Sequence, residues 1–420
     1  MGDMAEQTIE EVAAEVDAWL DENWDPALTV GEWWQRLADA RLSHPMLPEN
    51  AGGRGWSRAL AQTALRAMAA KSVLGPPTGL GHMLAAPTIA AHGDQAQIDE
   101  FVTPILNGQQ AWCQLFSEPQ AGSDLAGLQT RAERDGDEWI INGQKVWTSG
   151  GQIADMGMLI ARTNPEAPKH KGISYFAIDM HQPGIDVRPL REMTGRSFFN
   201  EVFITDARVP HSAMIGEQGE GWRVANTTLG VERASIGAGS TGVAGSLPGT
   251  IANRLGNNVG ETAARGRSGE GGVPGVGMGL WNRMKDLAVK LGRDDDPILR
   301  NELARMYSRL QINRYNLLRA KAGGARTGGE GNIAKLIDAE LIQEFRDLGM
   351  NIIGADGMLR GESSTTDEAL SEIALFSPAP AIYGGTNEVQ KNIIGERVLG
   401  LPKEPGPARD TPFDELPRNV

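Results

Sequence analysis

The sequence predicts a mixed α and β fold in which helices and strands occupy separate stretches of the chain. From about Glu6 to Ile105, apolar residues recur every three or four positions, as they do along one face of a helix. From about residue 113 to 215, short apolar runs alternate with turn residues, a pattern typical of strands. After Gly221 the helical spacing returns. We therefore expect an α+β architecture in which two helical regions flank a sheet along the chain.

The expected sheet region begins with two turn dipeptides, Asp135-Gly136 and Asn142-Gly143. An Asn-Gly pair between apolar runs is a strong hairpin signal, because both residues tolerate a positive φ. We therefore predict a hairpin turn at Asn142-Gly143, between the apolar runs 139–141 and 145–147. Further strand-like runs cover residues 158–160, 173–178 and 202–204.

The last region carries helical stripes such as Leu303, Met306 and Leu310, and two segments depart from this pattern. Residues 249–279 contain ten glycines and few apolar side chains. Such a segment cannot offset its ordering entropy by burial, so we predict a flexible loop that interrupts the C-terminal region. The tail after Leu401 is rich in proline and charge, and predicts an arm or a frayed end.

Composition and charge exclude several classes of protein. The net charge of −14 argues against a nucleic-acid-binding surface, which needs clustered Lys and Arg. No run approaches the roughly 18 apolar residues of a membrane span. The first twenty residues contain no basic side chain, so we expect neither a secretory signal nor a transit peptide. The single cysteine, Cys113, allows no internal disulfide and fits a reducing compartment. We expect a soluble, cytoplasmic protein.

Two sequence blocks carry most of the functional information. The first is Phe-Ser-Glu-Pro-Gln-Ala-Gly-Ser-Asp-Leu at residues 116–125, and the second is Ile-Tyr-Gly-Gly-Thr-Asn-Glu-Val-Gln at residues 382–390. A Gly-Ser-Asp turn that leaves a strand offers backbone N–H donors with little steric bulk. In this order and at this separation, the two blocks resemble the fingerprint segments of the acyl-CoA dehydrogenase family of FAD enzymes. The match extends from about residue 30 to residue 403.

The resemblance implies both a fold and a reaction. It implies an N-terminal α-helical domain at 1–112, a central β-barrel-like domain at 113–220, a C-terminal four-helix bundle at 221–403 with the insertion 249–279, and a tail at 404–420. The implied reaction removes two hydrogens across the Cα–Cβ bond of an acyl-CoA thioester in fatty-acid or lipid catabolism, as in β-oxidation. The family also implies FAD as cofactor, electron-transferring flavoprotein as oxidant, and a dimer or tetramer.

The resemblance places the cofactor on three elements of the chain. In the family, the segment matching Gln114 to Ser123 wraps the flavin, with a hydroxyl at the position of Ser117. A Trp-x-Ser element matches residues 147–149, and its Trp packs on the flavin ring. Thr386 and Glu388 match positions that meet the pyrophosphate and adenosine parts of FAD. The implied cofactor-binding residues are Gln114, Phe116, Ser117, Gly122, Ser123, Trp147, Thr148, Ser149, Thr386 and Glu388. A Gly-Gly turn that caps a helix through Asn387 is compatible with anion contact, since both use free N–H groups.

The catalytic base departs from the commonest family pattern. The position that usually holds the base is Gly384, whose backbone N–H can polarise a thioester carbonyl but cannot accept a proton. Relatives that resemble isovaleryl-CoA and long-chain acyl-CoA dehydrogenases carry the glutamate on an earlier helix, in a Leu-x-x-Glu-Arg pattern. This chain reads Leu-Gly-Val-Glu-Arg at residues 229–233. The resemblance therefore makes Glu232 the base, and assigns substrate contacts to Ser123, Arg233 and Tyr383. A glycine at 384 also favours a wider pocket for branched or bulky acyl groups.

One expected element is missing. Many family members have an Arg-x-x-Phe-Gly motif whose Arg reaches the FAD of the neighbouring subunit, and we find no such motif here. Residues 351–357 only imperfectly match a second inter-subunit contact, Gln-x-x-Gly-Gly-x-Gly. We therefore hypothesise that the chain pairs with a related but different subunit that supplies the missing Arg.

Other patterns in the sequence carry less information. Residues 237–242 fit Gly-x-Gly-x-x-Gly but follow a helical segment, so they do not predict a dinucleotide-binding fold. The six histidines lack metal-ligand spacing, so we expect no metal site. Two alternatives to an acyl-CoA dehydrogenase stay open. One is a catalytically silent subunit that completes a partner's cofactor site, and the other is an oxygen-using flavin oxidase or monooxygenase.

Overall fold

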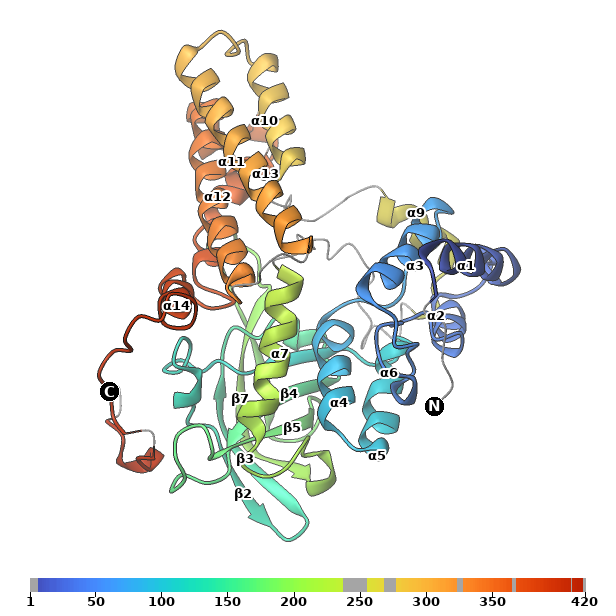
Figure 1. The fold of residues 1–420 in the computed structure, drawn as a ribbon, viewed down its shortest axis with the longest axis vertical. Helices are drawn as coiled ribbons and strands as arrows, with labels where there is room; N and C mark the ends of the chain where they lie inside the picture. The colour runs from blue at the N-terminus through green and yellow to red at the C-terminus, as the bar shows by residue number, and fades with distance from the viewer. Residues whose placement is uncertain are drawn as a thin grey trace.

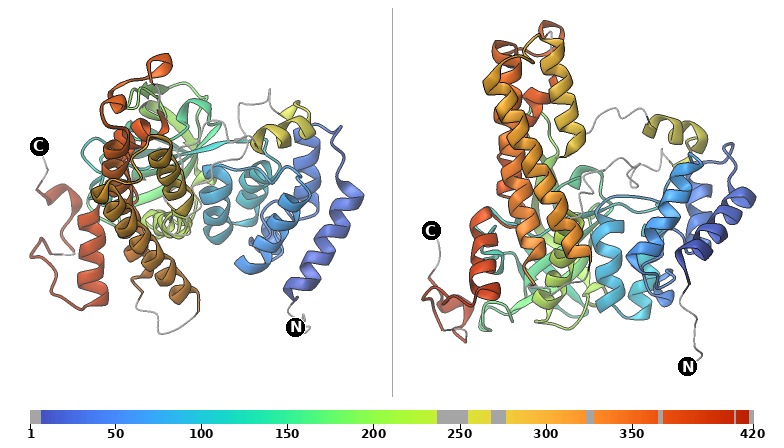
Figure 2. Two further views of the ribbon diagram at one scale, coloured as in Figure 1. Left: turned by 90° about the horizontal axis from the view of Figure 1, so that it is seen from above. Right: turned by 45° about the horizontal axis from the view of Figure 1, so that its top comes forward.

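The chain folds into a helical N-terminal part, a central sheet and a tall helical bundle, as Figure 1 shows. The computed structural model describes residues 7–236, 255–267, 277–322, 328–364, 368–408 and 410–417. The α+β fold expected from the sequence is confirmed. Figure 2 shows the bundle and the N-terminal helices on opposite sides of the molecule, with the sheet region between and below them.

The N-terminal part is a layer of helices around an aromatic core. Its α-helices are α1 (Ile9–Asn23), α2 (Val30–Asp39), α3 (Arg58–Ala70), α4 (Ala86–His92), α5 (Gln95–Gln97) and α6 (Thr103–Leu106), and its 3₁₀ and π turns are η1 (Glu49–Ala51), η2 (Gly81–Ala85) and η3 (Ile98–Val102). Capping boxes built on Thr8 and Thr29 start α1 and α2, because each threonine accepts an N–H of the first turn. Trp33 and Trp34 of α2 are almost fully buried and donate to the carbonyls of Leu74 and Gly75.

The central sheet has seven strands. They are β1 (Trp112–Leu115), β2 (Arg131–Asp135), β3 (Glu138–Lys145), β4 (Met156–Arg162), β5 (Ile173–Asp179), β6 (Ile185–Leu190) and β7 (Phe199–Pro210), joined by η4 (Leu125–Gly127), η5 (Gly151–Ile153) and η6 (His211–Ala213). The strand order is β1-β4-β2-β3-β7-β6, with β5 paired to β4. Both β1 and β2 run parallel to β4, and the other pairs are antiparallel. Among the described strands no pairing joins β6 to β1 or β5, so the sheet forms an open half-barrel.

The hairpin predicted at Asn142-Gly143 is wrong. Residues 138–145 form one continuous strand, and the register against β7 shifts between Ile141 and Gly143. The Asn142 side chain exchanges two hydrogen bonds with Asp206 across this shift. A Cβ at Gly143 would lie 2.3 Å from Thr130 Oγ1, so the glycine serves close packing and the pair forms a bulge. The β2–β3 turn instead contains Gly136, with a φ of 63°.

The C-terminal part begins with α7 and continues into the bundle. Its helices are α7 (Gly221–Ile236), α10 (Met278–Lys290), α11 (Pro297–Lys321), α12 (Glu330–Ile353), α13 (Glu368–Phe376) and α14 (Asn387–Ile393), with short turns η7 (Gly354–Met358), η8 (Gly361–Ser363), η9 (Ala379–Ala381), η10 (Ile394–Val398) and η11 (Phe413–Glu415). Helices α10 to α13 share one apolar core, which includes Met284, Leu341 and Phe345. Helix α7 packs on β5, on η2 and α4, and on α12, so it joins all three parts.

The glycine-rich insertion was predicted to be a flexible loop, and part of it is instead a docked helix. Residues 255–267 contain α9 (Val259–Arg267), which lies on the N-terminal helices. Val259 is fully buried in the N-terminal core, and its N–H donates to Leu28 O at 2.9 Å. Val259 and Leu255, which also packs against this core, supply together with backbone pairing the burial that the composition concealed. The remaining residues of the predicted loop, 249–254 and 268–276, lie outside the described part, as does the Gly-x-Gly-x-x-Gly stretch 237–242.

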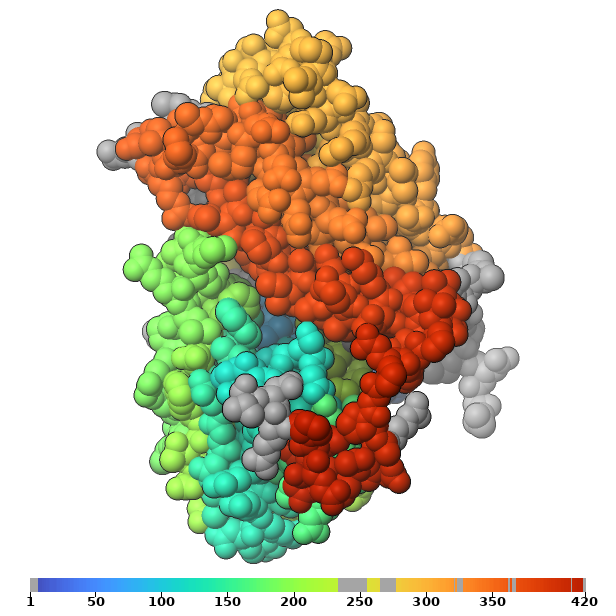
Figure 3. All heavy atoms as spheres, turned by 90° about the vertical axis from the view of Figure 1, so that its left-hand side faces the viewer, coloured from blue at the N-terminus to red at the C-terminus, as the bar shows by residue number. Residues whose placement is uncertain are grey.

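The C-terminal tail was predicted to be an arm or a frayed end. The described residues 410–417 instead dock on the sheet domain, where Phe413 is only 9% exposed. Figure 3 shows this dark red segment lying against the teal and green atoms of the sheet domain. The prediction failed because it considered proline and charge content and not the one buried aromatic side chain.

Candidate active site

The two predicted flavin segments in the sheet domain lie directly beside each other. Val146 N–H donates to Ser117 O at 2.9 Å, and Lys145 Nζ donates to Phe116 O at 3.1 Å. Segment 114–123 leaves β1, whereas segment 147–149 leaves β3. The structure thus brings together two groups of residues that the sequence predicted separately.

The first segment presents a tight turn followed by an open loop. Gln114 is half-buried in β1, and Phe116 is buried edge-on to Tyr175. Glu118 and Ala121 exchange two backbone hydrogen bonds of 3.1 Å, which fixes the turn ahead of Gly122. Gly122 and Ser123 are both exposed, and a Cβ added at Gly122 would meet no atom within 4 Å. Space beside this backbone is therefore open to a bound group.

Trp147 is an exposed aromatic residue on a strained backbone. Its side chain is 61% exposed, although the neighbouring residues Val146 and Thr148 are buried. Its φ of 62° is unusual for a bulky side chain, and such strain persists mainly where function requires it. Phe199 packs edge-on against the indole, with ring centres 5.8 Å apart. The indole is therefore held in place and offers a face to a planar ligand.

Thr148 carries a buried hydroxyl that lacks a partner. Backbone hydrogen bonds of 3.0 Å in both directions fix it against Asn200, and Asn200 Nδ2 also donates to Thr148 O. Thr148 Oγ1 is buried without a hydrogen-bond partner in the described protein. Buried polar atoms are normally satisfied, so an orphaned hydroxyl beside an exposed Trp points to an absent ligand. Ser149, the next residue, is half-buried.

Glu232, the predicted base, lies half-buried near the end of α7. Its neighbours Leu229 and Val231 pack against the apolar core of the sheet domain. Helix α7 also contacts α12 of the bundle, so Glu232 is on the element that crosses from sheet to bundle. Arg233 follows on the same helix, and only its backbone belongs to the described part of the chain.

The Gly384 turn is held from two helices. Gly384 and Gly385 have φ values of 63° and 86°, which L side chains rarely adopt. Gln390 Nε2 donates to the carbonyls of both glycines, at 2.9 and 3.3 Å. Asn332 of α12 in turn donates to Gln390 Oε1 at 2.7 Å. Helix α12 therefore contacts both the helix of Glu232 and the support of Gly384.

The helix after this turn is capped one residue earlier than predicted. Thr386, rather than Asn387, is the N-cap of α14, and its Oγ1 accepts from Val389 N–H at 3.2 Å. Asn387 is the first helical residue, and its Oδ1 is buried without a hydrogen-bond partner in the described protein. Glu388 is exposed in the first turn. Thr386 serves as the cap because its hydroxyl lies three residues before Val389, the spacing at which an N-cap side chain accepts an N–H of the first turn.

Sequence reasoning missed a group of polar residues on the bundle face beside Tyr383. Lys335 of α12 is 3% exposed, and its ammonium has no hydrogen-bond partner in the described protein. One turn later, burial raises the pKa of Asp338 to about 6, although Asn313 donates a hydrogen bond to it. Burial and the charge of Asp338 also raise the pKa of Tyr383, which is 40% exposed. Polar residues at positions expected to be apolar were the available signal.

At the far end of α12, Arg293 donates to the carbonyls of Asn351 and Ile352 and pairs with Asp296. This arginine lies beside the segment 351–357 that resembles an inter-subunit contact. Because its guanidinium caps α12 and pairs with an acid of its own chain, Arg293 is already engaged. Arg293 therefore does not take over the role of the arginine in the missing Arg-x-x-Phe-Gly motif.

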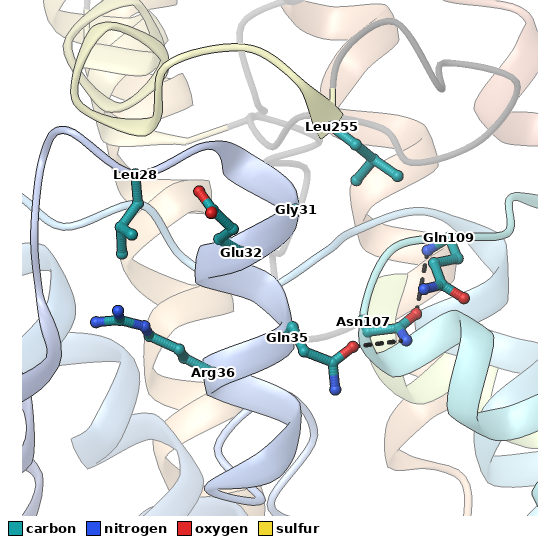
Figure 4. A pocket seen from close by; sticks show the side chains of 8 residues that line it. All are labelled: Leu28, Gly31, Glu32, Gln35, Arg36, Asn107, Gln109 and Leu255. Carbon is teal, nitrogen blue, oxygen red and sulfur yellow. Dashed lines mark hydrogen bonds between the residues drawn. The ribbon is translucent and has the colours of Figure 1, made fainter.

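A separate polar pocket of about 420 Å³ lies between α2 and residue Leu255. Figure 4 shows Asn107 in it, bonded to Gln35 and to the backbone N–H of Gln109. None of the predicted site residues lines this pocket.

Within the described ranges, no group of three or more His, Cys, Asp or Glu side chains is arranged to hold a metal, and no helix is both long and apolar enough to cross a bilayer.

The fold and these elements define a class of protein. Family models of the N-terminal, middle and C-terminal domains of acyl-CoA dehydrogenases match residues 1–109, 113–207 and 285–399. The chain therefore belongs to the acyl-CoA dehydrogenase family, whose members are FAD-binding oxidoreductases of lipid catabolism. Both the predicted family and the predicted cofactor are confirmed.

Two curated relatives match most of the chain. It is 35% identical to acyl-CoA dehydrogenase IpdE1 of Mycobacterium tuberculosis over 95% of this chain and 99% of the relative. It is 36% identical to acyl-CoA dehydrogenase FadE34 of the same organism, over 87% of this chain but only 46% of that longer protein.

Two similar solved structures are named as assemblies of two components. The steroid acyl-CoA dehydrogenase Tcur3481-Tcur3483 has a TM-score of 0.69 and 26% identity, covering 94% of this chain and 98% of that chain. The ChsE4-ChsE5 complex of Mycobacterium tuberculosis has a TM-score of 0.68 and 26% identity, covering 96% of this chain and all of that chain. Oligomerisation is therefore a property of the proteins that this chain resembles.

The residues present fit FAD. Trp147 offers an aromatic face, Thr148 Oγ1 is an unpaired buried hydroxyl, and the backbone at Gly122 borders open space. At the start of α14, the Glu388 carboxylate accepts hydrogen bonds from its own backbone N–H and from Thr386, which lowers the pKa of Glu388. The fit to a flavin therefore rests on the flat apolar contact and on the hydrogen-bonding groups of segments 114–123 and 147–149.

Proposed function

We propose that this chain catalyses the α,β-dehydrogenation of an acyl-CoA thioester to the 2,3-enoyl-CoA, with Glu232 as the base. The observation that carries the proposal is the junction of segments 114–123 and 147–149, where exposed Trp147 adjoins the unpaired Thr148 hydroxyl. Helix α7 brings Glu232 to the bundle that also supports Gly384. A flavin site and a carboxylate on a connecting helix are the two components that a dehydrogenation needs, and their presence supports the proposal.

In this proposal the chain's own groups control the proton and the carbonyl. Glu232 takes the weakly acidic α-proton, while the Gly384 N–H hydrogen-bonds to the thioester oxygen and stabilises the charge that develops there. Bound FAD supplies the acceptor for the hydride that leaves the β-carbon. The apolar neighbours of Glu232, Leu229 and Val231, limit the access of water to the carboxylate, which strengthens its interaction with the substrate. Arg233 and Ser123 contact the substrate.

We assign a bulky acyl group as the substrate. Gly384 places no side chain where the commonest base of the family lies, and this leaves room beside the Cα–Cβ bond. The steroid acyl-CoA dehydrogenase is a similar structure at 26% identity, which supports a polycyclic or branched acyl group for this chain. A panel of acyl-CoA thioesters in which short straight chains react fastest would contradict this assignment.

The proposed assembly contains a related but different subunit. Two similar structures carry paired names, and Arg293 is engaged with its own chain, so a cationic contact from a second chain fits. The measured quantity is the FAD-to-chain ratio of this polypeptide purified alone and with candidate partners. One FAD per chain in a homo-oligomer would exclude the two-subunit arrangement.

We further propose electron-transferring flavoprotein as the oxidant and the cytoplasm as the location, since buried Cys113 suits a reducing compartment.

The decisive experiment is the Glu232→Gln substitution, with Glu220→Gln as control because Glu220 directly precedes α7, is exposed and pairs with Arg223. We expect acyl-CoA to bleach the flavin band about 10²–10⁴-fold more slowly in the first variant, at unchanged FAD content. Unchanged bleaching would exclude Glu232 as base. If turnover of the assembled complex were also unchanged, a silent subunit would be favoured. Rapid reoxidation of the reduced enzyme by air, with peroxide formed, would indicate an oxidase or monooxygenase.

A further inference from the structure

The C-terminal segment 410–417 is joined to the loop after β4 by backbone pairing. Pro412 forms an antiparallel bridge with Pro168. The N–H groups of Phe413 and Asp414 donate to the carbonyls of Ala167 and Pro165, at 3.1 and 3.2 Å. Backbone hydrogen bonds of this kind define a fixed register, so they hold the side chain of Phe413 in one position on the sheet domain.

In this position the Phe413 ring lies against the face of the Arg162 guanidinium. The Arg162 carbon Cζ lies 3.3 Å from the centre of the Phe413 ring, and Arg162 is only 4% exposed. Burial lowers the pKa of Arg162 to about 10, so the side chain stays cationic at neutral pH. A buried cation over an aromatic ring is among the stronger forms of this interaction. Phe413 therefore shields one face of the guanidinium and restricts its rotation.

The edges of the same guanidinium hold the loop that follows Ser123. Arg162 donates to the carbonyls of Ala126 and Leu128, at 2.7 and 3.3 Å, and to Lys169 O at 3.1 Å. The Lys169 ammonium in turn pairs with Asp124, the residue directly after Ser123. Within the described ranges, the Ser123 hydroxyl makes no hydrogen bond to protein. The position of Ser123 is therefore set by residues 124–128 and by what holds them.

The segment also closes a connection between the two halves of the site. It follows α14 and η10, whose first residues lie at the Gly384 turn, and it ends on the sheet domain next to the Ser123 loop. Figure 3 shows this part of the chain extending from the bundle onto the sheet domain.

We propose that Phe413 is a positioning residue for the cofactor and substrate loop, acting through Arg162 on residues 122–128. This inference rests on the proposed function only in that the loop meets FAD and acyl-CoA. Phe413 does not itself touch either ligand. Its contribution is to keep the carbonyls of Ala126 and Leu128, and with them Gly122 and Ser123, in the geometry that the bound cofactor needs.

The test compares four variants of the full chain, purified with its partner subunit where the two co-purify. Phe413→Ala removes the ring, Phe413→Leu keeps apolar volume without an aromatic face, and Phe413→Tyr keeps the face. Glu415→Ala changes an exposed neighbour and serves as control. Two quantities are measured: the amide hydrogen exchange of residues 124–130 without FAD, and the FAD dissociation constant by flavin fluorescence.

We expect Phe413→Ala to raise both the exchange rate and the FAD dissociation constant about tenfold. Phe413→Tyr and Glu415→Ala should both keep the exchange rate and the FAD dissociation constant at their wild-type values. Phe413→Leu should resemble Phe413→Ala if the ring face is what matters. Wild-type exchange and FAD affinity in Phe413→Ala would overturn the proposal. A wild-type assembly of this chain with its partner subunit that binds no FAD would instead contradict the proposed function, and the exchange measurement would still test the role of Phe413.

Discussion

Glu118 and Lys145 form an ion pair of 2.9 Å with side chains only 3% and 0% exposed. Glu118 also accepts from the N–H groups of Gln129 and Thr130, at 2.6 and 2.9 Å, while Lys145 donates to Phe116 O. Burial alone would raise the pKa of Glu118, but Lys145 and the hydrogen bonds together outweigh it and lower that pKa. The pair therefore connects β3 with Phe116 and Glu118 at the start of the loop that follows β1, and with residues 129–130 at the end of that loop.

Lys145→Met should destabilise the protein by about 3–5 kcal/mol, because it leaves the Glu118 carboxylate buried without its counter-ion. The double variant Glu118→Gln with Lys145→Met should recover part of this loss, since the Glu118 charge is then removed as well. The recovery is partial because the buried Arg162 cation loses the stabilising charge of Glu118. Urea unfolding of the four members of this double-mutant cycle measures the coupling. Additive effects of the two substitutions would mean that the two side chains do not interact.

Trp147→Gly should weaken FAD binding at least tenfold with little change in thermal stability. Relief of the positive φ, worth about 1 kcal/mol, opposes the loss of the edge contact with Phe199, of similar size. Calorimetry and flavin fluorescence measure the two effects separately. The control is Trp139→Gly, which removes a 2% exposed core side chain and should cost about 3–5 kcal/mol. A large loss of stability in Trp147→Gly would assign this residue a structural role.

His82 should make the protein sensitive to acid. Burial, together with the neighbouring His44, lowers the pKa of His82 from 6.5 to about 3, while its Nε2 lies 2.9 Å from Ser43 O. Between these values the unfolded chain binds a proton that the folded protein does not, so stability falls as pH decreases from 6.5. His82→Gln should reduce this slope by up to about 1.4 kcal/mol per pH unit.

Melting temperatures between about pH 4 and pH 7 measure this slope. His181→Gln is the matched control, because the His181 side chain is 57% exposed. An identical pH dependence in the wild type and the His82 variant would show that the histidine does not couple to folding.

Asp338→Asn should stabilise the protein at neutral pH. The pKa of Asp338 is raised from 3.8 to about 6, so the folded protein holds this proton more tightly than the unfolded chain, and stability is lost as pH rises through that window. Asn keeps an acceptor for Asn313 without the charge. The expected gain above pH 6 is about 1–2 kcal/mol after allowance for solvent screening of a half-buried group.

The measurement is the free energy of unfolding of wild type and variant at two pH values, one below 3.8 and one above about 6. The gain should be absent at the lower pH, where Asp338 is neutral in both the folded and the unfolded chain. Asp347→Asn, an exposed position on the same helix, is the control. A gain of equal size at both pH values would point to a cause other than ionisation.

Much of the architecture and the cofactor class could be predicted from the sequence. The helix, sheet and helix order, the family and FAD are confirmed, and segments 114–123 and 147–149 lie side by side as a shared flavin site requires. The roles of Glu232, Arg233 and Gly384 stay predictions. The bulge at Asn142 was missed because its conformation depends on Asp206 and Thr130, which only the sheet brings close.

The sequence by itself determined the family and the cofactor class, because both follow from the identity and order of the residues in segments such as 116–125 and 382–390. It also determined the alternation of helices and strands, because apolar periodicity is a local property. Only the tertiary structure decided that Val259 anchors the glycine-rich insertion, that Lys145 neutralises Glu118, and that Phe413 docks on Arg162. Each depends on burial and charge pairing between distant parts of the chain, and those energies exist only once the fold has brought the partners together.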